Sequence, residues 1–435
     1  MKTYRPSILQ SQIRTTADIW KDIQHSTYPA DRWLRSFFYQ NRKKYGSRDR
    51  RFFSDTIFCL FRHKTLIETW MSAITPSRTV ANKTTGEELA VVFAAAMEGI
   101  ISAAEFESFA APTIYPLIRE KKLPKGFTFN STAEELSTVY SFPLWLVQRW
   151  IKHFGLNETK VLLAITNERP QLAIRINPIR MTRERQMERF RNQKLKFRPT
   201  LWSNHGIILD ERISLLEGED FQKGFFEVQD EGSQLVCEII APKEGETVWD
   251  VCAGGGGKSL FMAGLMKNKG RIIATDIRPK KLEDLRKRAT RSEIFNIFPA
   301  DLNLIDETAV MKKGVDKIVI DAPCSGSGTL RRNPDAKWKL SEQRFLEHQK
   351  DQIAIIEKAI PYLKQAGELF YITCSIEPSE NEEVIENILE NYPNMKKSSI
   401  YVPDRLSSVM KNGFVQLWPP RHHTDGFFMA KLRKV

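Results

Sequence analysis

From about residue 241 onward, short apolar runs alternate with amphipathic helical segments. The apolar runs are TVWDVCA, RIIATDI, NIFPAD, KIVIDAPC and ELFYITCS. Alternation of this kind predicts a doubly wound, mainly parallel sheet with helices on both faces. The later segments GFVQLW and GFFMAKL indicate a closing antiparallel pair. Ser379 and Glu382 have the spacing of a capping box, so a helix is expected just after ELFYITCS.

Two different patterns precede this α/β domain, which we assign to residues 241–435. Over residues 1–140, segments such as DRRFFSDTIFCLFRHKTLIETWMSAI and EELAVVFAAAMEGIISAAEF place apolar residues at helical spacing, which predicts an all-α domain. Over residues 141–240, the helix FPLWLVQRWIKHF is followed by LAIRIN, the basic helix RERQMERFRNQ, LKFRPTLW and HGIILDE. We expect a small α+β domain there. Its pattern alone leaves open whether it binds RNA or only links its neighbours.

The charge of the chain favours a polyanionic partner. The 435 residues carry a net charge of +13, with basic stretches at 41–51 and 175–198. Nucleic acid is favoured over membrane, and no segment has the length and apolar character of a signal peptide or membrane span. The five cysteines include no CxxC pair, which argues against a disulfide framework and a zinc site. We expect a cytoplasmic protein without a bound metal.

The segment VWDVCAGGGGKS is a buried strand that runs into four glycines and then a helix. A P-loop needs a glycine where Cys252 stands, and the third glycine of the dinucleotide fingerprint falls at Ser259. Asp276 ends the next strand, in position to accept ribose hydroxyls, and Asp301 ends the third strand, in reach of an adenine edge. A nucleoside cofactor with a zwitterionic tail and no phosphate fits this set, and we expect S-adenosylmethionine. The candidate cofactor-binding residues are Cys252, Ala253, Gly254, Gly255, Gly256, Gly257, Lys258, Asp276, Asp301 and Asp321.

Cys324 and Cys374 each end a predicted strand, where open α/β sheets bind their ligands. Asp321 lies close to Cys324 in the sequence. The other cysteines, at 59, 237 and 252, are interpreted as small apolar core residues. None of the seven histidines lies within ten residues of Cys324 or Cys374, which disfavours acyl transfer. The residues alone leave open which of the two thiols reacts.

Five motifs carry a family resemblance: DVCAGGGGKS, IATDI, FPAD, DAPCSGSGTLRRNPDAKW and YITCSIEPSENEEVI. In order and spacing they are similar to the motifs of the RsmB/Sun family of RNA cytosine-C5 methyltransferases, and RRNPDAKW resembles the bacterial RsmB branch. The resemblance covers residues 229–435 and, less specifically, the helical part. It implies a Rossmann-like S-adenosylmethionine-dependent methyltransferase domain after an all-α NusB-like RNA-binding domain and the small α+β domain.

The resemblance also implies the roles of individual residues. Cys374 would be the nucleophile that adds to carbon 6 of cytosine, Cys324 would help to release the product, and Asp321 would hold the ring. The basic residues Arg331, Arg332 and Lys337 are expected to contact RNA. The family has Ala-Pro where this chain has Gly254 and Gly255, so more backbone freedom is lost on binding and weaker cofactor binding is expected.

The expected product is 5-methylcytosine in small-subunit ribosomal RNA, made by a monomer without a membrane partner. Transfer RNA is the alternative substrate for the same chemistry. A DNA cytosine methyltransferase carries its nucleophile in the PC motif, and Cys374 disfavours that assignment. A catalytically idle RNA-binding factor for ribosome assembly is the alternative from another class, and the intact Cys324, Cys374, Asp276 and Asp321 argue against it.

Overall fold

The computed structural model describes residues 6–73, 84–210, 215–302, 305 and 309–435. Contacts divide the chain into a helical unit, Met1–Arg169 with Leu330–Lys339, and an α/β unit, Pro170–Thr329 with Leu340–Val435. The division at residue 169 lies beyond the expected boundary at 140. Within the described ranges, no helix combines the length and the apolar character that a membrane crossing requires.

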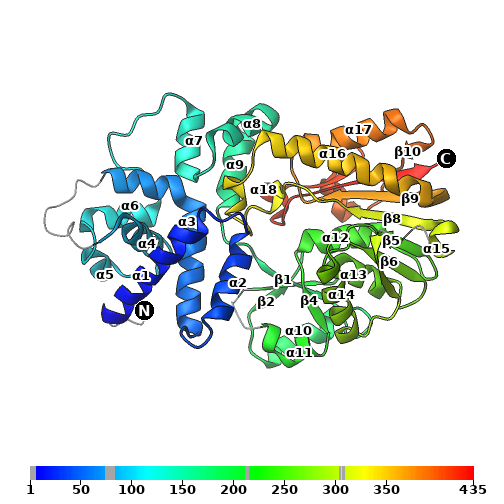
Figure 1. The fold of residues 1–435 in the computed structure, drawn as a ribbon, viewed down its shortest axis with the longest axis horizontal. Coiled ribbons are helices and arrows are strands. Elements are labelled where there is room, and N and C mark those ends of the chain that lie inside the picture. The colour runs from blue at the N-terminus through cyan, green and yellow to red at the C-terminus, as the bar shows by residue number, and fades with distance from the viewer. Residues whose placement is uncertain (1–5, 74–83, 211–214, 303–304, 306–308) are drawn as a thin grey trace. The chain divides into compact units, whose positions relative to one another are not determined.

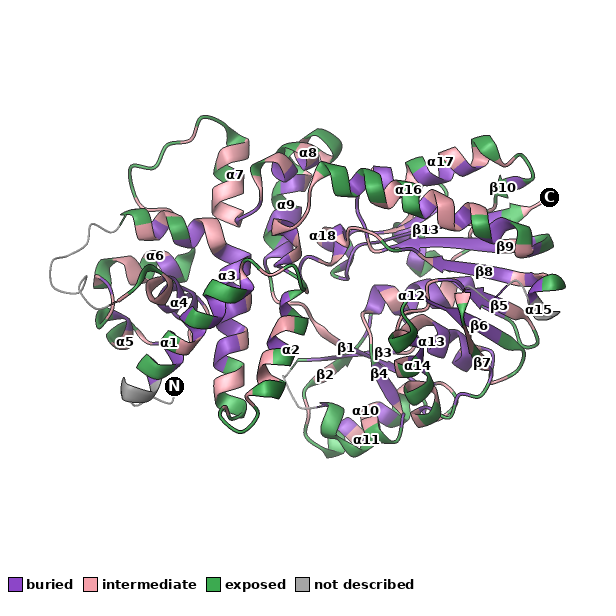
Figure 2. Cartoon of the chain, in the orientation of Figure 1, coloured by how far each residue is buried: buried purple, intermediate pink, exposed green. Residues whose placement is uncertain are grey.

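The helical unit has a core of apolar side chains from its first four long helices, and these side chains are buried (Figures 1 and 2). The central helix α3 contacts α1, α4 and α7. Residues 330–339, which include a short 3-10 turn at Ala336–Trp338, belong to this unit although they lie far along the chain. Its α-helices are α1 (Pro6–Ile23), α2 (Ala30–Gln40), α3 (Ser47–Ala73), α4 (Gly86–Met97), α5 (Ala103–Glu107), α6 (Tyr115–Glu120), α7 (Thr132–Tyr140), α8 (Leu144–Phe154) and α9 (Leu156–Thr166).

The α/β unit begins with a small antiparallel sheet in the order β2-β3-β1-β4. The expected strand–helix–strand–strand pattern is found, and a fourth short strand, β4, completes the sheet. That strand is only three residues long, Phe-Glu-Val, which is too short to show an alternating pattern. The elements are β1 (Leu172–Ile176), α10 (Arg183–Asn192), β2 (Phe197–Pro199), β3 (Gly206–Leu209), α11 (Glu219–Gln222), β4 (Phe226–Val228) and the following helix α12 (Glu231–Ile240).

The large sheet of the described α/β unit has nine strands in the order β11-β12-β13-β9-β8-β5-β6-β7, with β10 paired to β13. Strands β9, β8, β5, β6 and β7 are parallel, whereas β13 runs antiparallel to β9 and β12. The mainly parallel sheet and its closing antiparallel pair are therefore confirmed. The strands are β5 (Thr247–Asp250), β6 (Arg271–Thr275), β7 (Ile297–Ala300), β8 (Val315–Asp321), β9 (Leu363–Thr373), β10 (Met395–Lys397), β11 (Met410–Lys411), β12 (Phe414–Leu417) and β13 (Phe427–Lys434).

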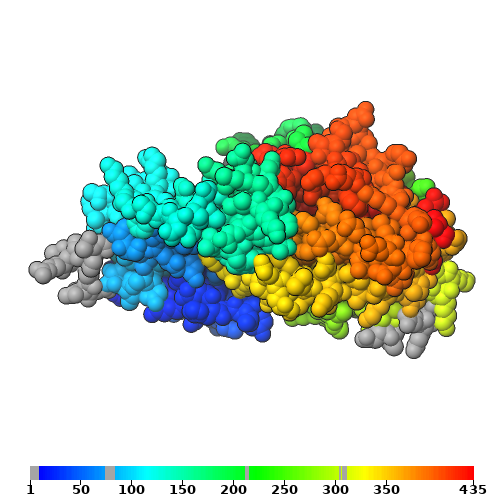
Figure 3. All heavy atoms as spheres, turned by 90° about the horizontal axis from the view of Figure 1, so that it is seen from above, coloured from blue at the N-terminus to red at the C-terminus, as the bar shows by residue number. Residues whose placement is uncertain are grey.

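Helices cover both faces of this sheet, as the alternation of side chains requires (Figure 1). Val319 packs into one core with α12, α13 and α14, whereas its neighbours Ile318 and Ile320 pack into a second core with α16 and α17. In Figure 3, α16 (gold) and α17 (orange) lie at the surface, on the outer side of this second core. The helices are α13 (Gly257–Leu265), α14 (Pro279–Arg291), α15 (Ala309–Lys312), α16 (Glu342–Ala359), α17 (Glu382–Asn391) and α18 (Pro419–His422).

The expected capping box at Ser379 and Glu382 is wrong. Ser379 lies inside a 3-10 turn, Pro378–Glu380, and α17 begins only at Glu382. The residue before the helix, Asn381, uses its side chain to donate a hydrogen bond to the Ser375 carbonyl at 3.0 Å. This contact and the bonds of Glu380 hold the chain in the tighter turn, so the helix starts after them.

Candidate active site

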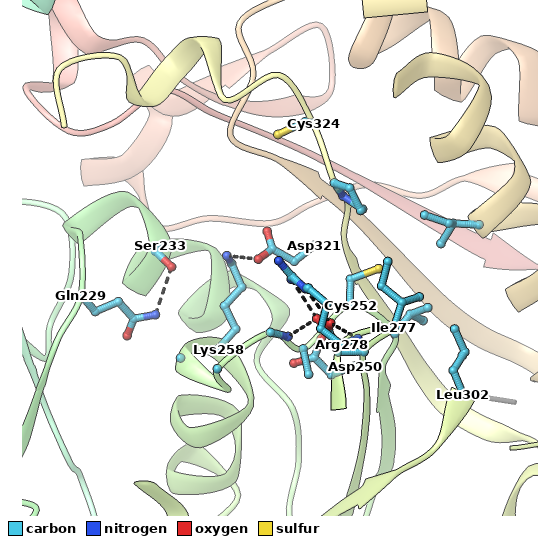
Figure 4. Close-up of a pocket in the computed structure, with 18 of the residues that line it drawn as sticks. Gln229, Ser233, Asp250, Cys252, Lys258, Ile277, Arg278, Leu302, Asp321 and Cys324 are labelled. Atoms are coloured by element: carbon cyan, nitrogen blue, oxygen red, sulfur yellow. Dashed lines mark hydrogen bonds and ion pairs between the residues drawn. The ribbon is translucent and has the colours of Figure 1, made fainter. Parts of the chain in front are cut away.

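A cavity of about 700 Å³ lies at the carboxyl ends of β5, β6 and β8 (Figure 4). Its walls come from the loop after β5, from the residues that follow β6 and β8, and from the segment that leads into α12. The carboxyl ends of neighbouring parallel strands meet at one edge of the sheet, which is where ligands of open α/β folds bind. Most of the candidate residues predicted from the sequence lie at this edge.

The glycine loop adopts a conformation that needs glycine. Gly254 and Gly256 have φ angles of +54° and +79°, in the left-handed region that side chains disfavour. A methyl group on Gly256 would lie 1.9 Å from Cδ1 of Leu285, so the loop or this side chain of α14 would have to shift. The N–H of Gly254 donates to the Asp276 carboxylate at 2.9 Å, which joins the loop to the end of β6.

Asp276 is held as a carboxylate by donors on both sides. It accepts the backbone N–H of Arg278 at 2.8 Å and the guanidinium of the same residue at 2.9 Å. Burial would raise the pKa of Asp276, but these bonds, the Arg278 charge and the Gly254 N–H together lower it. Asp301 is exposed after β7 and lies outside the cavity wall, whereas its neighbour Leu302 lines the cavity.

Asp250 lines the same cavity and was not among the predicted site residues. One of its carboxylate oxygens accepts the hydroxyl of Ser259, and the other is buried with no hydrogen-bond partner in the described structure. Burial, with the negative charge of Asp321 nearby, raises the pKa of Asp250 to about 7. An unused buried acceptor at the cavity wall fits a ligand that carries donor groups, such as the amino group of S-adenosylmethionine. The signal in the sequence was the acid directly before VCAGGGG.

Lys258 and Asp321 form an ion pair at the cavity, with Nζ 2.6 Å from Oδ2 (Figure 4). Burial would lower the pKa of Lys258, but the charge and hydrogen bond of Asp321 outweigh it and the pKa is raised. The lysine therefore remains an ammonium beside the carboxylate. Lys258, grouped with the cofactor residues in the sequence, thus also belongs to the group around Asp321.

The two thiols lie side by side at the ends of adjacent parallel strands. Cys324 follows β8 and Cys374 follows β9, and their sulfur atoms are 3.3 Å apart. The hydrogen bond between them, burial, and the charges of Cys374 and Glu380 raise the pKa of the Cys324 thiol well above its ordinary value. The N–H of Gly328 donates to the Cys374 carbonyl at 3.0 Å and ties the two loops together. At this distance either sulfur can donate a hydrogen bond to the other.

Most of the other predicted residues also surround the cavity. Gln229, Ser233, Arg278 and Arg288 line it as well, and no local motif in the sequence indicated them. Cys59 and Cys237 are fully buried core residues, as expected, whereas Cys252 is half-buried and lines the cavity. The predicted residues in the wall are Cys252, Ala253, Gly254, Gly255, Gly257, Lys258, Asp276, Asp321 and Cys324, and Gly256, Asp301 and Cys374 are outside it.

Two of the three predicted RNA-binding residues are buried in the helical unit. Lys337 is 1% exposed, and its ammonium donates to the Arg62 carbonyl at 2.9 Å and to the Asn167 side chain at 3.2 Å. Arg331 is also buried and pairs with Glu168 at 3.2 Å. RNA contact by Lys337 and Arg331 stays a prediction, and the burial and internal hydrogen bonds of both side chains argue against it in this conformation. Arg332 is half-buried.

A doubly wound sheet with a glycine loop and acids at its carboxyl edge defines the class of S-adenosylmethionine-dependent methyltransferases. Residues 237–433 match the family model of the 16S rRNA methyltransferase RsmB/F, and residues 142–215 match the model of the RsmF/B-like ferredoxin-like domain. The probable ribosomal RNA small subunit methyltransferase B of Synechocystis is 33% identical over 69% of this chain and 68% of its own length. The chain therefore belongs to the RsmB/F family.

Solved structures support the same class. The methyltransferase homolog protein from Pyrococcus horikoshii is 26% identical, with a TM-score of 0.60 over 71% of this chain and 100% of that one. NSun6 from Pyrococcus horikoshii with SFG, an S-adenosylmethionine analogue, shares the fold at a TM-score of 0.58, with 21% identity over 66% of this chain and 97% of its own. The protein is an S-adenosylmethionine-dependent RNA methyltransferase.

Proposed function

We propose that the protein methylates carbon 5 of a cytosine in small-subunit ribosomal RNA through a covalent adduct with Cys374. The observation that carries this proposal is the thiol pair, 3.3 Å apart, of which Cys324 lines the cofactor cavity together with Asp321. Methyl transfer to a base nitrogen or a ribose oxygen needs no thiol, whereas transfer to carbon 5 does. This carbon is too weak a nucleophile until a thiolate has added to carbon 6.

In the addition step, the Cys374 thiolate forms a bond to carbon 6 and the electron pair of the carbon 5–carbon 6 double bond moves into the ring. Asp321 accepts a hydrogen bond from the exocyclic amino group or protonated N3, and Lys258 keeps the carboxylate oriented. When bound, S-adenosylmethionine would supply an electrophilic methyl group. Asp276, Asp250 and the loop Cys252–Gly257 are the residues that would hold it.

The release step uses Cys324 as the base. The causes of its raised pKa are, in order, its hydrogen bond with Cys374, burial, the charge of Cys374 and the charge of Glu380. Once Cys374 is bonded to carbon 6, the hydrogen bond and the charge of Cys374 are gone while burial and Glu380 remain, so loss of the Cys324 proton to solvent becomes easier. The Cys324 thiolate then takes the carbon 5 proton, the ring double bond re-forms, and the bond to carbon 6 breaks with its electron pair on Cys374. One proton is released per cycle and both thiols return to their starting state.

We propose that RNA is also held by a cleft in the helical unit. A cavity of about 550 Å³ between α2 and α3 is lined by Arg35, Arg42, Arg50, Phe38 and Tyr39. Tyr39 is 70% exposed, and the Arg42 guanidinium lies over one face of its ring, 4.9 Å from the ring centre. Exposed aromatic faces stack on unpaired bases, and guanidinium groups bind phosphates, which supports single-stranded RNA as the occupant.

Alanine variants of the two cysteines test the adduct chemistry. With RNA and cofactor, Cys374→Ala should abolish methylation, and Cys324→Ala should accumulate a covalent protein–RNA adduct on a denaturing gel. Wild-type protein should be trapped by RNA that carries 5-fluorocytidine, because fluorine blocks the final proton removal. An adduct trapped by Cys374→Ala would overturn the assignment of the nucleophile.

The substrate is tested by mapping 5-methylcytosine at base resolution in a strain that lacks the protein. Loss of one site in small-subunit ribosomal RNA, restored by the wild-type gene and not by Cys374→Ala, is the expected result. Loss at a transfer-RNA site alone would contradict the ribosomal assignment and leave the cysteine chemistry in place.

A further inference from the structure

One buried carboxylate contacts both cysteine loops. Ser325 follows Cys324, and Ser375 follows Cys374. Glu380, which has no exposed surface, accepts the Ser325 N–H at 2.8 Å and the Ser325 hydroxyl at 2.5 Å. The same carboxylate accepts the hydroxyl of Ser375. Glu380 therefore binds the residue after each thiol, although the two loops lie about 50 residues apart in the chain.

Further bonds fix the position of Glu380. Gln352 of α16 donates to its carboxylate at 3.3 Å and to the Pro323 carbonyl at 2.9 Å. The hydroxyl of Tyr371, in β9, donates to the Glu380 backbone carbonyl at 2.6 Å. Because Glu380 lies in a 3-10 turn before α17, three structural elements converge on this residue. This accounts for the late start of α17.

We propose that Glu380 is a positioning residue for the methyl transfer: it clamps the two loops so that the two thiols stay at hydrogen-bonding distance. The clamp rests on the two-thiol chemistry proposed above. Glu380 acts through Ser325 and Ser375 and does not touch the substrate.

The charge of Glu380 has a second effect, on the order of the proton transfers. It contributes, after Cys374 and burial, to the raised pKa of Cys324. Unlike the influence of Cys374, this contribution persists when Cys374 is bonded to the cytosine. A nearby negative charge makes the Cys324 thiolate a stronger base at the moment when it must take the carbon 5 proton. Geometry and charge therefore serve the same step.

The test begins with Glu380→Gln, which removes the charge and keeps the size of the side chain. We expect kcat to fall about tenfold with the KM values for RNA and cofactor unchanged, because the loss affects a chemical step and not binding. A larger fraction of the enzyme should stand as covalent adduct during turnover, because release is slowed. Glu368→Gln is the matched control, since Glu368 lies in β9, pairs with Lys317 of β8 and Lys431 of β13, and contacts neither cysteine loop.

A second readout needs no RNA and separates the charge from the fold. In a Cys374→Ala background, the rate of Cys324 alkylation by iodoacetamide is followed against pH by peptide mass spectrometry. Removal of a negative charge stabilises the thiolate, so Glu380→Gln should move the half-maximal rate to lower pH. Glu380→Asp keeps the charge with a shorter arm, and should leave this midpoint near that of the parent while kcat still falls.

Outcomes against the clamp are distinct from outcomes against the adduct chemistry. An unchanged alkylation midpoint together with near-normal kcat in Glu380→Gln would overturn the clamp. If Glu380→Gln does not fold, Ser325→Ala and Ser375→Ala can be used instead, because each removes one hydroxyl that donates to Glu380 and leaves the carboxylate in place. Each should lower kcat about threefold without a change in KM, and wild-type kcat in both would count against the proposal. Methylation by Cys374→Ala would instead refute the two-thiol chemistry itself.

Discussion

At Gly256 the backbone angle φ is +79°, and the space beside the α-carbon is filled by Leu285. The positive φ and the contact with Leu285 both arise from the turn between β5 and α13, which places the loop against α14. Gly255, one residue earlier, has no left-handed φ, and an added methyl would lie 3.3 Å from the flexible end of Arg288. The guanidinium of Arg288 in turn donates to the Gly255 carbonyl and lies 3.0 Å from Glu227 of β4. This contact braces a loop that lacks the family's proline.

Gly256→Ala should therefore damage the cofactor site much more than Gly255→Ala. The left-handed backbone and the clash with Leu285 together cost about 2–4 kcal/mol, so the free energy of unfolding should fall by that amount. Calorimetric titration should show cofactor affinity reduced about tenfold or more in Gly256→Ala, because the loop moves. Equal affinities in the two variants would show that the left-handed turn does not shape the site.

At the level of the elements, α3 is kinked at His63, where φ is −124° and ψ is 24°. Two carbonyls just before the kink accept hydrogen bonds from the 330–339 segment. The Trp338 indole donates to the Phe61 carbonyl at 2.8 Å, and Lys337 donates to that of Arg62. The Leu66 N–H, which would normally bond Arg62, donates to Ser141 at 3.0 Å. The kink and the segment thus satisfy each other's polar groups.

Lys337→Met should destabilise the helical unit by about 2 kcal/mol, because it leaves the Arg62 carbonyl and the Asn167 side chain without their donor. Chemical denaturation measures this, with the exposed Lys350→Met as the control. Burial and the charge of Arg62 hold the pKa of Lys337 well below its ordinary value of about 10.4. At pH values between the lowered pKa of folded Lys337 and about 10.4, this lysine binds more protons in the unfolded chain than in the folded one.

The stability that depends on Lys337 should therefore rise with pH across that window, and Lys337→Met should lack this rise. A difference between wild type and variant that stays constant with pH would contradict the burial of a readily deprotonated lysine.

The large sheet could be predicted because the spacing of apolar residues such as Val319 shows which segments are strands and which are helices. Most of the candidate site residues could be predicted because short motifs mark the carboxyl ends of those strands. The partners of Lys337 were not predictable. A Lys-Trp pair in a basic segment looks exposed. It is buried because both side chains donate hydrogen bonds to carbonyls beside the kink in α3, which lies far away in the chain. Glu380 was likewise hidden, since a capping box was the obvious interpretation of that stretch. Such contacts depend on tertiary structure, which periodicity does not report.

For the whole molecule, the net charge of +13 is consistent with an RNA substrate, but the charges have different uses. Lys337 and Arg331 are buried within the helical unit and add little to its surface potential. Arg35 and Arg42 are exposed at the cleft beside Tyr39, where they are open to a ligand. Affinity for RNA and the rate of chemistry should therefore depend on separate sets of residues, one in each unit.

This separation can be measured with Tyr39→Ala and Arg42→Ala. Loss of one stacked base or one phosphate contact costs about 1–3 kcal/mol, so the KM for RNA should rise about tenfold while kcat stays unchanged. Arg42→Ala should also reduce the slope of log affinity against log salt by about one, because one phosphate contact is lost, whereas Tyr39→Ala should leave the slope unchanged. Tyr28→Ala is the matched control, since Tyr28 is 67% exposed in the same unit and does not line the cleft. If all three variants behave alike, the cleft between α2 and α3 does not bind RNA, and the positive charge acts through another surface.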